Sequence, residues 1–329
     1  MTTHRRQLLL AALLPPLAAP VAAAAQPAPG WRPERPIRAI VPFAPGGFTD
    51  LQARLMTEPV SALLGQPVVI ENRAGGAAGL IGTDAVAKAA PDGHTILINS
   101  SAHAIAPALV ARMPYDVAAD FAGVSLLGRA PMLLVCHPSV PAQNLGELLA
   151  LLRASPGRFN FAAAGIGSTV HLTGEVFRAA AEVQIQFVQY RGGGPALQAV
   201  ISGEAHLTAV STAEALGHVR GGAVRALAVS APGRSPALPD VPTSGEGGLP
   251  AFQQDIWIVV VAPVRTPRPA ITVLNAAFNA AARRLEPRLN ELGAQISADV
   301  VTPEQVDAFI RSELQRYAAV LRAAGVQPE

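Results

Sequence analysis

The chain is poor in several residue types, and each scarcity excludes a class of protein. Of 329 residues only one is a cysteine, Cys136, so an internal disulfide framework is excluded. Charged residues make up only 15% and hydrophobic residues 50%, which is typical of a folded rather than a disordered chain. The formal net charge is +2 and the basic residues form no cluster, so nucleic acid and anionic membrane surfaces are not expected partners.

The common signatures of catalytic and cofactor sites are also missing. The chain contains neither Gly-x-Ser-x-Gly nor His-Glu-x-x-His, and its seven histidines lack metal-ligand spacing. The pair Gly165 and Gly167 lacks the third glycine of a dinucleotide-binding fingerprint. Cys136 lies within an apolar run, which indicates a buried and inert thiol. We therefore expect no metal, no cofactor and no enzymatic activity.

The first 25 residues have the pattern of a cleavable export signal. Arg5 and Arg6 precede the apolar run 8–14, and the segment closes in small residues at 23–25. This run is too short, and too rich in proline, for a membrane span. Cleavage after Ala25 would reduce Lys+Arg from 25 to 23, equal to the 23 Asp+Glu. The sequence thus predicts an exported protein with almost no net charge, which leaves the cytoplasm by the general secretory or the twin-arginine route.

The rest of the chain alternates short β-rich runs with helical patterns, which is typical of an α/β protein. The same alternation restarts after Pro131, which suggests two lobes, and the last helices are expected to return to the first lobe. We expect lobe 1 to comprise residues 31–130 and 251–329, and lobe 2 residues 131–250. Expected strands are 37–43, 68–72, 95–99, 132–136, 159–163, 185–190, 225–230 and 256–262. Expected helices are 51–64, 80–89, 145–153, 170–181, 195–202, 271–285 and 304–324.

Three glycine-rich loops, 45–50, 164–169 and 190–195, lie between an expected strand and an expected helix. Free N–H groups at a helix N-terminus can bind an anion, so these loops are candidate ligand sites. Asp50 could cap its helix or contact a ligand, and Pro195 is expected to begin a helix. His103, after a strand end, could face the same crevice.

Five segments together resemble the Bug family, the extracytoplasmic solute receptors of tripartite tricarboxylate transporters. They occur in the expected order between about Arg35 and Gly325, and they are VPFAPGGFTD (41–50), ENRAG (71–75), PDGHT (91–95), YRGG (190–193) and RSPALPDVPT (234–243). The resemblance implies a type II periplasmic-binding-protein fold, in which two α/β lobes close on a ligand in the cleft between them. Phe48 stands where the family often has a smaller or polar residue, which implies a narrower or more apolar pocket.

The resemblance also implies which residues bind the ligand. They come from strand-end loops of both lobes: Phe43, Gly46, Gly47, Phe48, Thr49, Asp50, Ser101, Ala164, Gly167, Ser168, Thr169, Tyr190, Gly192 and Ser211.

The function that follows is capture of a small organic carboxylate for delivery to integral membrane transporter subunits. Aromatic acids, dicarboxylates and amino acids all remain open as ligands, and a monomer is the expected state. Two alternatives remain. In one, the same receptor acts as a ligand sensor for a signalling partner. In the other, the protein is an exported hydrolase that uses Ser168 or Ser101 with His103 or His171.

Overall fold

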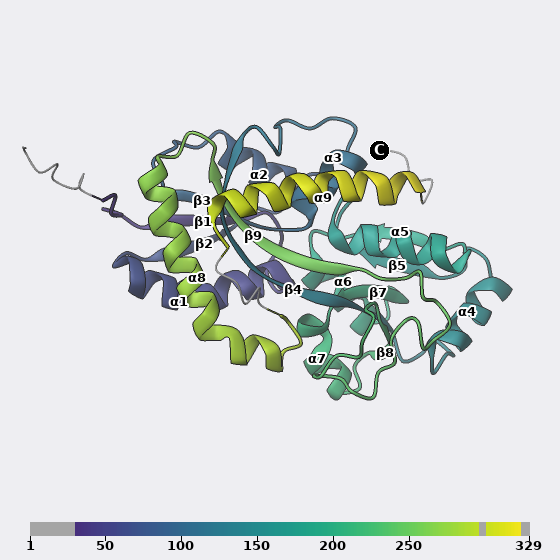
Figure 1. The fold of residues 1–329 in the computed structure, drawn as a ribbon. Coiled ribbons are helices and arrows are strands. Elements are labelled where there is room, and N and C mark those ends of the chain that lie inside the picture. The colour runs from purple at the N-terminus through teal and green to yellow at the C-terminus, as the bar shows by residue number, and fades with distance from the viewer. Residues whose placement is uncertain (1–29, 296–300, 324–329) are drawn as a thin grey trace, which may run out of the picture. The chain divides into compact units, whose positions relative to one another are not determined.

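The computed structural model describes residues 30–295 and 301–323. The elements follow one another in this order (Figure 1): β1 (Ile37–Val41), α1 (Phe48–Leu64), β2 (Val68–Asn72), η1 (Ala77–Gly79), α2 (Leu80–Ala87), β3 (Thr95–Ser100), α3 (Ala102–Leu109), β4 (Phe121–Cys136), α4 (Leu145–Ala154), β5 (Asn160–Ala163), α5 (Thr169–Ala181), β6 (Gln186–Gln189), α6 (Gly193–Ile201), β7 (Leu207–Ser211), α7 (Thr212–Arg220), β8 (Arg225–Val229), β9 (Asp255–Pro263), α8 (Arg268–Glu291) and α9 (Pro303–Ala323).

The long strand β4 belongs to two sheets. Its first part, residues 121–131, pairs antiparallel with β9, which continues the order β2-β1-β3-β9-β4. Its last part, Met132–Cys136, pairs with β7 and β8, and β7 leads on to β5 and β6. We call the first sheet with its helices lobe 1 and the second lobe 2. The predicted two-lobed α/β architecture is confirmed, and the residue limits given above for each lobe stay a prediction.

Helices cover the sheet of lobe 1, which explains why its central strands are almost continuously apolar. In β9, every residue from Ile256 to Pro263 is buried. Helix α9 packs against α3 and β4, and α8 packs against α1 and β4 (Figure 1). The indole of Trp257 on β9 is fully buried and donates a hydrogen bond to Glu313 Oε2 on α9 at 2.8 Å. This bond satisfies the buried indole N–H and ties β9 to α9, while Glu313 Oε1 accepts a second hydrogen bond from Arg316 Nε at 2.7 Å.

Several expectations about the elements were wrong. Helix α1 begins at Phe48 and not at residue 51, and α6 begins at Gly193, so Pro195 does not start it. Residues 121–131 and the elements β7, α3 and α7 were not expected. The first part of β4 contains register shifts between Gly123 and Ser125 and between Leu126 and Gly128, which break the alternation that marks a strand.

The predicted export signal lies outside the described residues. Within the described ranges, no helix combines the length and the apolar character that crossing a membrane requires.

Candidate functional site

A small cavity of about 30 Å³ lies where the strand-end loops of the two lobes meet. This volume holds about two water molecules. Lobe 1 contributes the loops after β1 and β3 and one residue of β9, and lobe 2 contributes the loops after β5, β6 and β7. The lining residues are Phe43, Gly47, Phe48, Thr49, Asp50, Ser100, Ala164, Ser168, Thr169, Val170, Gly193, Glu214 and Ile256.

Helix α1 brings its N-terminus to this cavity without a side-chain cap, since its N-cap residue is Gly47. Asp50 is the third residue of the helix, so of the two roles considered for it, that of N-cap is not the one it has. Its Oδ2 instead accepts hydrogen bonds from the N–H of Gly46 at 3.0 Å and from Arg54 Nε at 2.9 Å. Its Oδ1 accepts one from Asn72 Nδ2 at 2.9 Å. Burial raises the pKa of Asp50, but these hydrogen bonds outweigh it, and the net pKa is below the ordinary value.

Helix α5 brings a second N-terminus to the cavity from lobe 2. The Ser168 hydroxyl caps it by accepting the N–H of His171 at 3.1 Å. The next residue, Thr169, has its Oγ1 2.7 Å from Ser101 Oγ, which follows β3 in lobe 1. The first N–H groups of each helix have no partner within that helix. The closed cleft therefore places two helix N-termini, one from each lobe, around a single small space.

A buried carboxylate, Glu214, also lines the cavity. Ser211 and Glu214 form a capping box at the start of α7, in which Glu214 Oε2 accepts the N–H of Ser211 at 3.0 Å and its hydroxyl at 2.9 Å. The side chain reaches the other lobe, because a Cβ added to Gly47 would lie 3.5 Å from Glu214 Oε1. Burial raises the pKa of Glu214 to about 7, although Ser211 and the N–H of Phe48 act against this rise. The sequence analysis missed this residue, although the spacing of Ser211 and Glu214 signals a helix start.

The structure brings together most of the expected ligand residues. Those that line the cavity are Phe43, Gly47, Phe48, Thr49, Asp50, Ala164, Ser168 and Thr169. Those outside its lining are Gly46, Ser101, Gly167, Tyr190, Gly192 and Ser211. Ser101 and Ser211 hydrogen-bond to lining residues, whereas the Tyr190 hydroxyl donates to Glu204 at 2.8 Å and lines a different surface pocket. The lining residues not foreseen are Ser100, Val170, Gly193, Glu214 and Ile256. That these residues bind a ligand stays a prediction.

The side chains named for the hydrolase alternative do not form a catalytic pair in the described structure. His103 does not line the cavity; its ring packs edge-on against Phe121 with the centroids 5.0 Å apart, and neither ring nitrogen has a hydrogen-bond partner among the described residues. Burial lowers the pKa of His103 to about 4. The Ser168 hydroxyl accepts the backbone N–H of His171, as a helix cap does. Cys136 is buried, as expected, and burial raises its pKa. No group of three metal-binding side chains occurs in the part of the chain that the structure describes.

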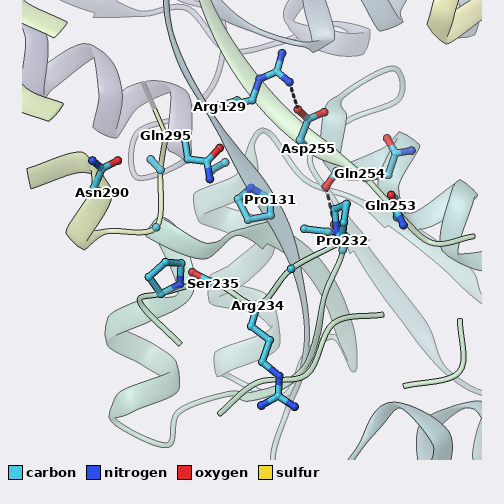
Figure 2. Close-up of a pocket in the computed structure, with 17 residues that line it drawn as sticks. Arg129, Pro131, Pro232, Arg234, Ser235, Gln253, Gln254, Asp255, Asn290 and Gln295 are labelled. Carbon is cyan, nitrogen blue, oxygen red and sulfur yellow. Dashed lines mark hydrogen bonds and ion pairs between the residues drawn. The ribbon is translucent and has the colours of Figure 1, made fainter. Parts of the chain in front are cut away.

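A larger cavity of about 670 Å³ lies on the opposite face of strand β9 (Figure 2). Asp255 of β9 lines the larger cavity, whereas the next residue, Ile256, lines the smaller one. Successive residues of a strand point to opposite faces, so the two cavities lie on opposite sides of β9. At the upper edge in Figure 2, Arg129 pairs with Asp255 at 3.4 Å. The groups around this cavity are mainly paired charges, amides and prolines, and no α-helix begins among its lining residues. The smaller cavity is therefore the better candidate for binding an anion.

Solved structures similar to this one define its class. MatC from Rhodopseudomonas palustris, solved with bound malate, is 36% identical with a TM-score of 0.83, covering 88% of this chain and 99% of that one. Rpa4515 of R. palustris, solved with adipate, is 33% identical with a TM-score of 0.85, covering 90% and 99%. A third, the periplasmic binding protein BugD, is 32% identical with a TM-score of 0.86, covering 90% of this chain and 100% of that one. The fold is therefore that of a two-lobed solute-binding protein, and the hydrolase alternative is not supported.

The sequence comparisons then give the family. Residues 52–326 match the model of the tripartite tricarboxylate transporter family receptor, TctC. Protein BugT of Bordetella pertussis is 40% identical over 314 residues, which cover 94% of each chain. The chain therefore belongs to the tripartite tricarboxylate transporter receptor family, and the resemblance to Bug proteins is confirmed.

Proposed function

We propose that the protein is a periplasmic receptor that captures a small organic dicarboxylate by lobe closure and delivers it to a tripartite tricarboxylate-type transporter. The observation that carries this proposal is the pair of helix N-termini, α1 and α5, that face one cavity from opposite lobes. Each N-terminus favours a negative charge through its free N–H groups and its dipole. A ligand with a carboxylate at each end matches two such sites. The malate and adipate bound by the relatives have this form.

The backbone groups can supply enough affinity without a cationic side chain. A hydrogen bond to a charged group contributes about 1.5–3 kcal/mol, so four N–H donors contribute about 6–12 kcal/mol before costs. Micromolar affinity requires about 8 kcal/mol net. Hydroxyl groups of Thr49 and Thr169, which also line the cavity, can add further donors. No arginine or lysine is among the described residues that line the cavity, and the guanidinium of Arg54 pairs with Asp50, so recognition by amide and hydroxyl groups fits the site.

The size of the cavity requires the lobes to move. A dicarboxylate needs more than the present 30 Å³, so it must enter an open form, after which the lobes close around it. Closure brings the donors of both lobes to the ligand, and a ligand that binds the closed form better shifts the population toward it. A transporter that recognises the closed form would thus receive loaded receptor.

A thermal-shift screen of organic acids, followed by calorimetry, tests the ligand class. Malate, succinate and adipate should raise the melting temperature, because a ligand that binds only the folded state stabilises it. Failure of every carboxylate to do so would contradict the proposal. Ala164→Met should abolish binding, since Ala164 is 5% exposed and lines the cavity. Its control is Ala154→Met, at the exposed end of α4 in the same lobe, which should bind as the wild type does.

The location and the partner have separate tests. Release of a protein that begins at Gln26 by osmotic shock would support periplasmic export. Loss of acid uptake on deletion of the gene, restored by the wild type and not by Ala164→Met, would support the transport role.

A further inference from the structure

Two carboxylates line the cleft, and they differ in what neutralises them. Asp50 accepts three hydrogen bonds, one of them from Arg54. Glu214 forms no ion pair within the described residues, and the residue is only 8% exposed. Its Oε1 accepts no hydrogen bond of ordinary geometry from them. An anionic ligand held by α1 would therefore lie beside a second, buried carboxyl group with no cation of its own.

We propose that Glu214 takes up one proton when the anionic ligand binds, and that it then donates a hydrogen bond to the ligand's carboxylate. This inference rests on the proposed function. The proton comes from the solvent and stays on Oε1, and no bond of the ligand forms or breaks. Glu214 would thus be a specificity-determining residue that favours anions without an ammonium group.

Competition for the same donors supports this role. The N–H of Phe48, at the open N-terminus of α1, acts on the Glu214 carboxylate in the empty cleft. A protonated Glu214 no longer needs that N–H and offers an O–H in addition, so the ligand gains two donors from one protonation. Two neighbouring carboxylates that are shielded from water do not both stay ionised.

The elements of the cleft bring few other charges to Glu214. From α1, Asp50 lines the same cavity as Glu214 and pairs with Arg54, and α6 (Gly193–Ile201) contains no titratable residue. Gly193 lies directly against the carboxylate, because a Cβ added there would be 2.5 Å from Oε1.

The charges on the elements packed against α7 are largely engaged elsewhere. Arg129 of β4 pairs with Asp255, and Arg225 of β8 donates to backbone carbonyls, that of Ala142 at 3.0 Å among them. On α7 itself, His218 lies one turn beyond Glu214, and both residues line a shallow outer pocket. His218 is therefore the residue to control for in any measurement of pH dependence.

The direction of the effect follows from burial. In the empty receptor the pKa of Glu214 is raised to about 7, so at pH 6 the group already holds its proton. A bound anion raises this pKa further, so above pH 7 binding must bring a proton with it, and affinity falls by up to about tenfold per pH unit. A ligand with an ammonium group would pair with the ionised form and give the opposite trend.

Calorimetry on the mature protein tests whether Glu214 takes up a proton on binding. Malate and, in parallel, adipate are titrated between pH 6.0 and 8.5 in two buffers of different ionisation enthalpy, and the difference in heat between the buffers gives the number of protons taken up. The wild type should take up almost no proton at pH 6.0 and close to one at pH 8.5, with the dissociation constant rising at least tenfold. In Glu214→Gln, which keeps the capping-box geometry, the affinity should be independent of pH and within about threefold of the wild-type value at pH 6.0. His218→Gln should keep the wild-type profile.

Three results would overturn the inference: binding by the wild type at pH 8.5 without proton uptake, proton uptake that persists in Glu214→Gln, or affinity that increases with pH. The wild type alone decides the first and the third, since the buffer comparison measures its proton uptake and the pH series its affinity. If neither acid nor any other carboxylate binds at any pH, the proposed function fails and this inference fails with it. Binding at pH 8.5 without proton uptake contradicts this inference alone.

Discussion

The hydroxyl oxygens of Ser101 and Thr169 lie 2.7 Å apart, although Ser101 follows β3 in lobe 1 and Thr169 begins α5 in lobe 2. Both side chains are almost completely buried, at 0% and 2% exposure. This hydrogen bond spans the cleft, so it exists only while the lobes are closed. The bond stabilises the closed form whether or not a ligand is present.

Removing this bond should weaken ligand binding. Ser101→Ala leaves the Thr169 hydroxyl with only its longer bond to Ser100 Oγ at 3.5 Å, at a cost of about 1 kcal/mol, which corresponds to a five- to tenfold higher dissociation constant. Calorimetry with the acid found by screening measures this change. The control is Ser312→Ala on the exposed face of α9, where the hydroxyl bonds only within its own helix. Equal affinities for the two variants would show that the interlobe bond does not contribute to closure.

A methyl group at Gly194 should obstruct closure. A Cβ there would lie 2.7 Å from the carbonyl oxygen of Pro45 and 3.1 Å from the nitrogen of Gly47, both backbone atoms of lobe 1. Backbone cannot rotate away as a side chain does, so Gly194→Ala should lower ligand affinity by tenfold or more. Gly217→Ala, on α7, meets no atom within 4 Å and should bind normally. Small-angle scattering of both variants with ligand should show a more open Gly194→Ala. A compact, fully active Gly194→Ala would contradict the closed geometry.

Asp50 should contribute more to stability than to ligand contact. Asp50→Ala leaves the N–H of Gly46 without its acceptor and removes one of the two acceptors of Asn72 Nδ2, the other being the carbonyl oxygen of Phe43, so the free energy of unfolding should fall by about 2–3 kcal/mol. Because hydrogen bonds lower the pKa of Asp50, its contribution is present at neutral pH and is lost as the pH falls below about 4. Urea unfolding at pH 7 and at pH 3 measures both effects. Arg54→Ala, which removes a half-exposed partner, should cost less than 1 kcal/mol.

Glu214 should make the empty receptor less stable as the pH rises. Its folded pKa of about 7 is above the ordinary value of 4.5, so the native state binds the proton more tightly between these values. Stability therefore falls from about pH 4.5 to pH 7 and is then constant, with a total cost of about 3 kcal/mol. Glu214→Gln should match the wild type near pH 4.5 and be more stable at pH 8. Parallel urea titrations of the two proteins measure the difference, and identical curves at pH 8 would contradict it.

Local sequence signals predicted much of the fold. The strand 68–72 was predicted with its observed bounds, and α4 within one residue, because β-branched residues and apolar helical spacing are local properties. The first part of β4 escaped prediction. It is a strand because β9, more than a hundred residues later in the chain, pairs with it, and its two register shifts obscure the alternating pattern.

The site was predicted in part for the same reason. The loops around Gly47 and Ser168 are recognisable from glycine and hydroxyl residues before a helix. The position of Glu214 depends on how the lobes meet, because its own capping box with Ser211 resembles that of any helix start. The contact between Ser101 and Thr169 likewise depends on the closed arrangement and has no local signal.

The membership of β4 in both sheets also limits how the protein can be engineered as a biosensor. A split between Pro131 and Met132 would leave each fragment with an unpaired strand edge, which invites aggregation. The exposed turn at Gly222, between α7 and β8, is better suited to insertion of a circularly permuted fluorescent protein. A Cβ added at Gly222 would have no other atom within 4 Å, so the turn has room for an insertion. Since α7 begins beside the cleft, strain transmitted along that helix would turn ligand capture into a change of fluorescence.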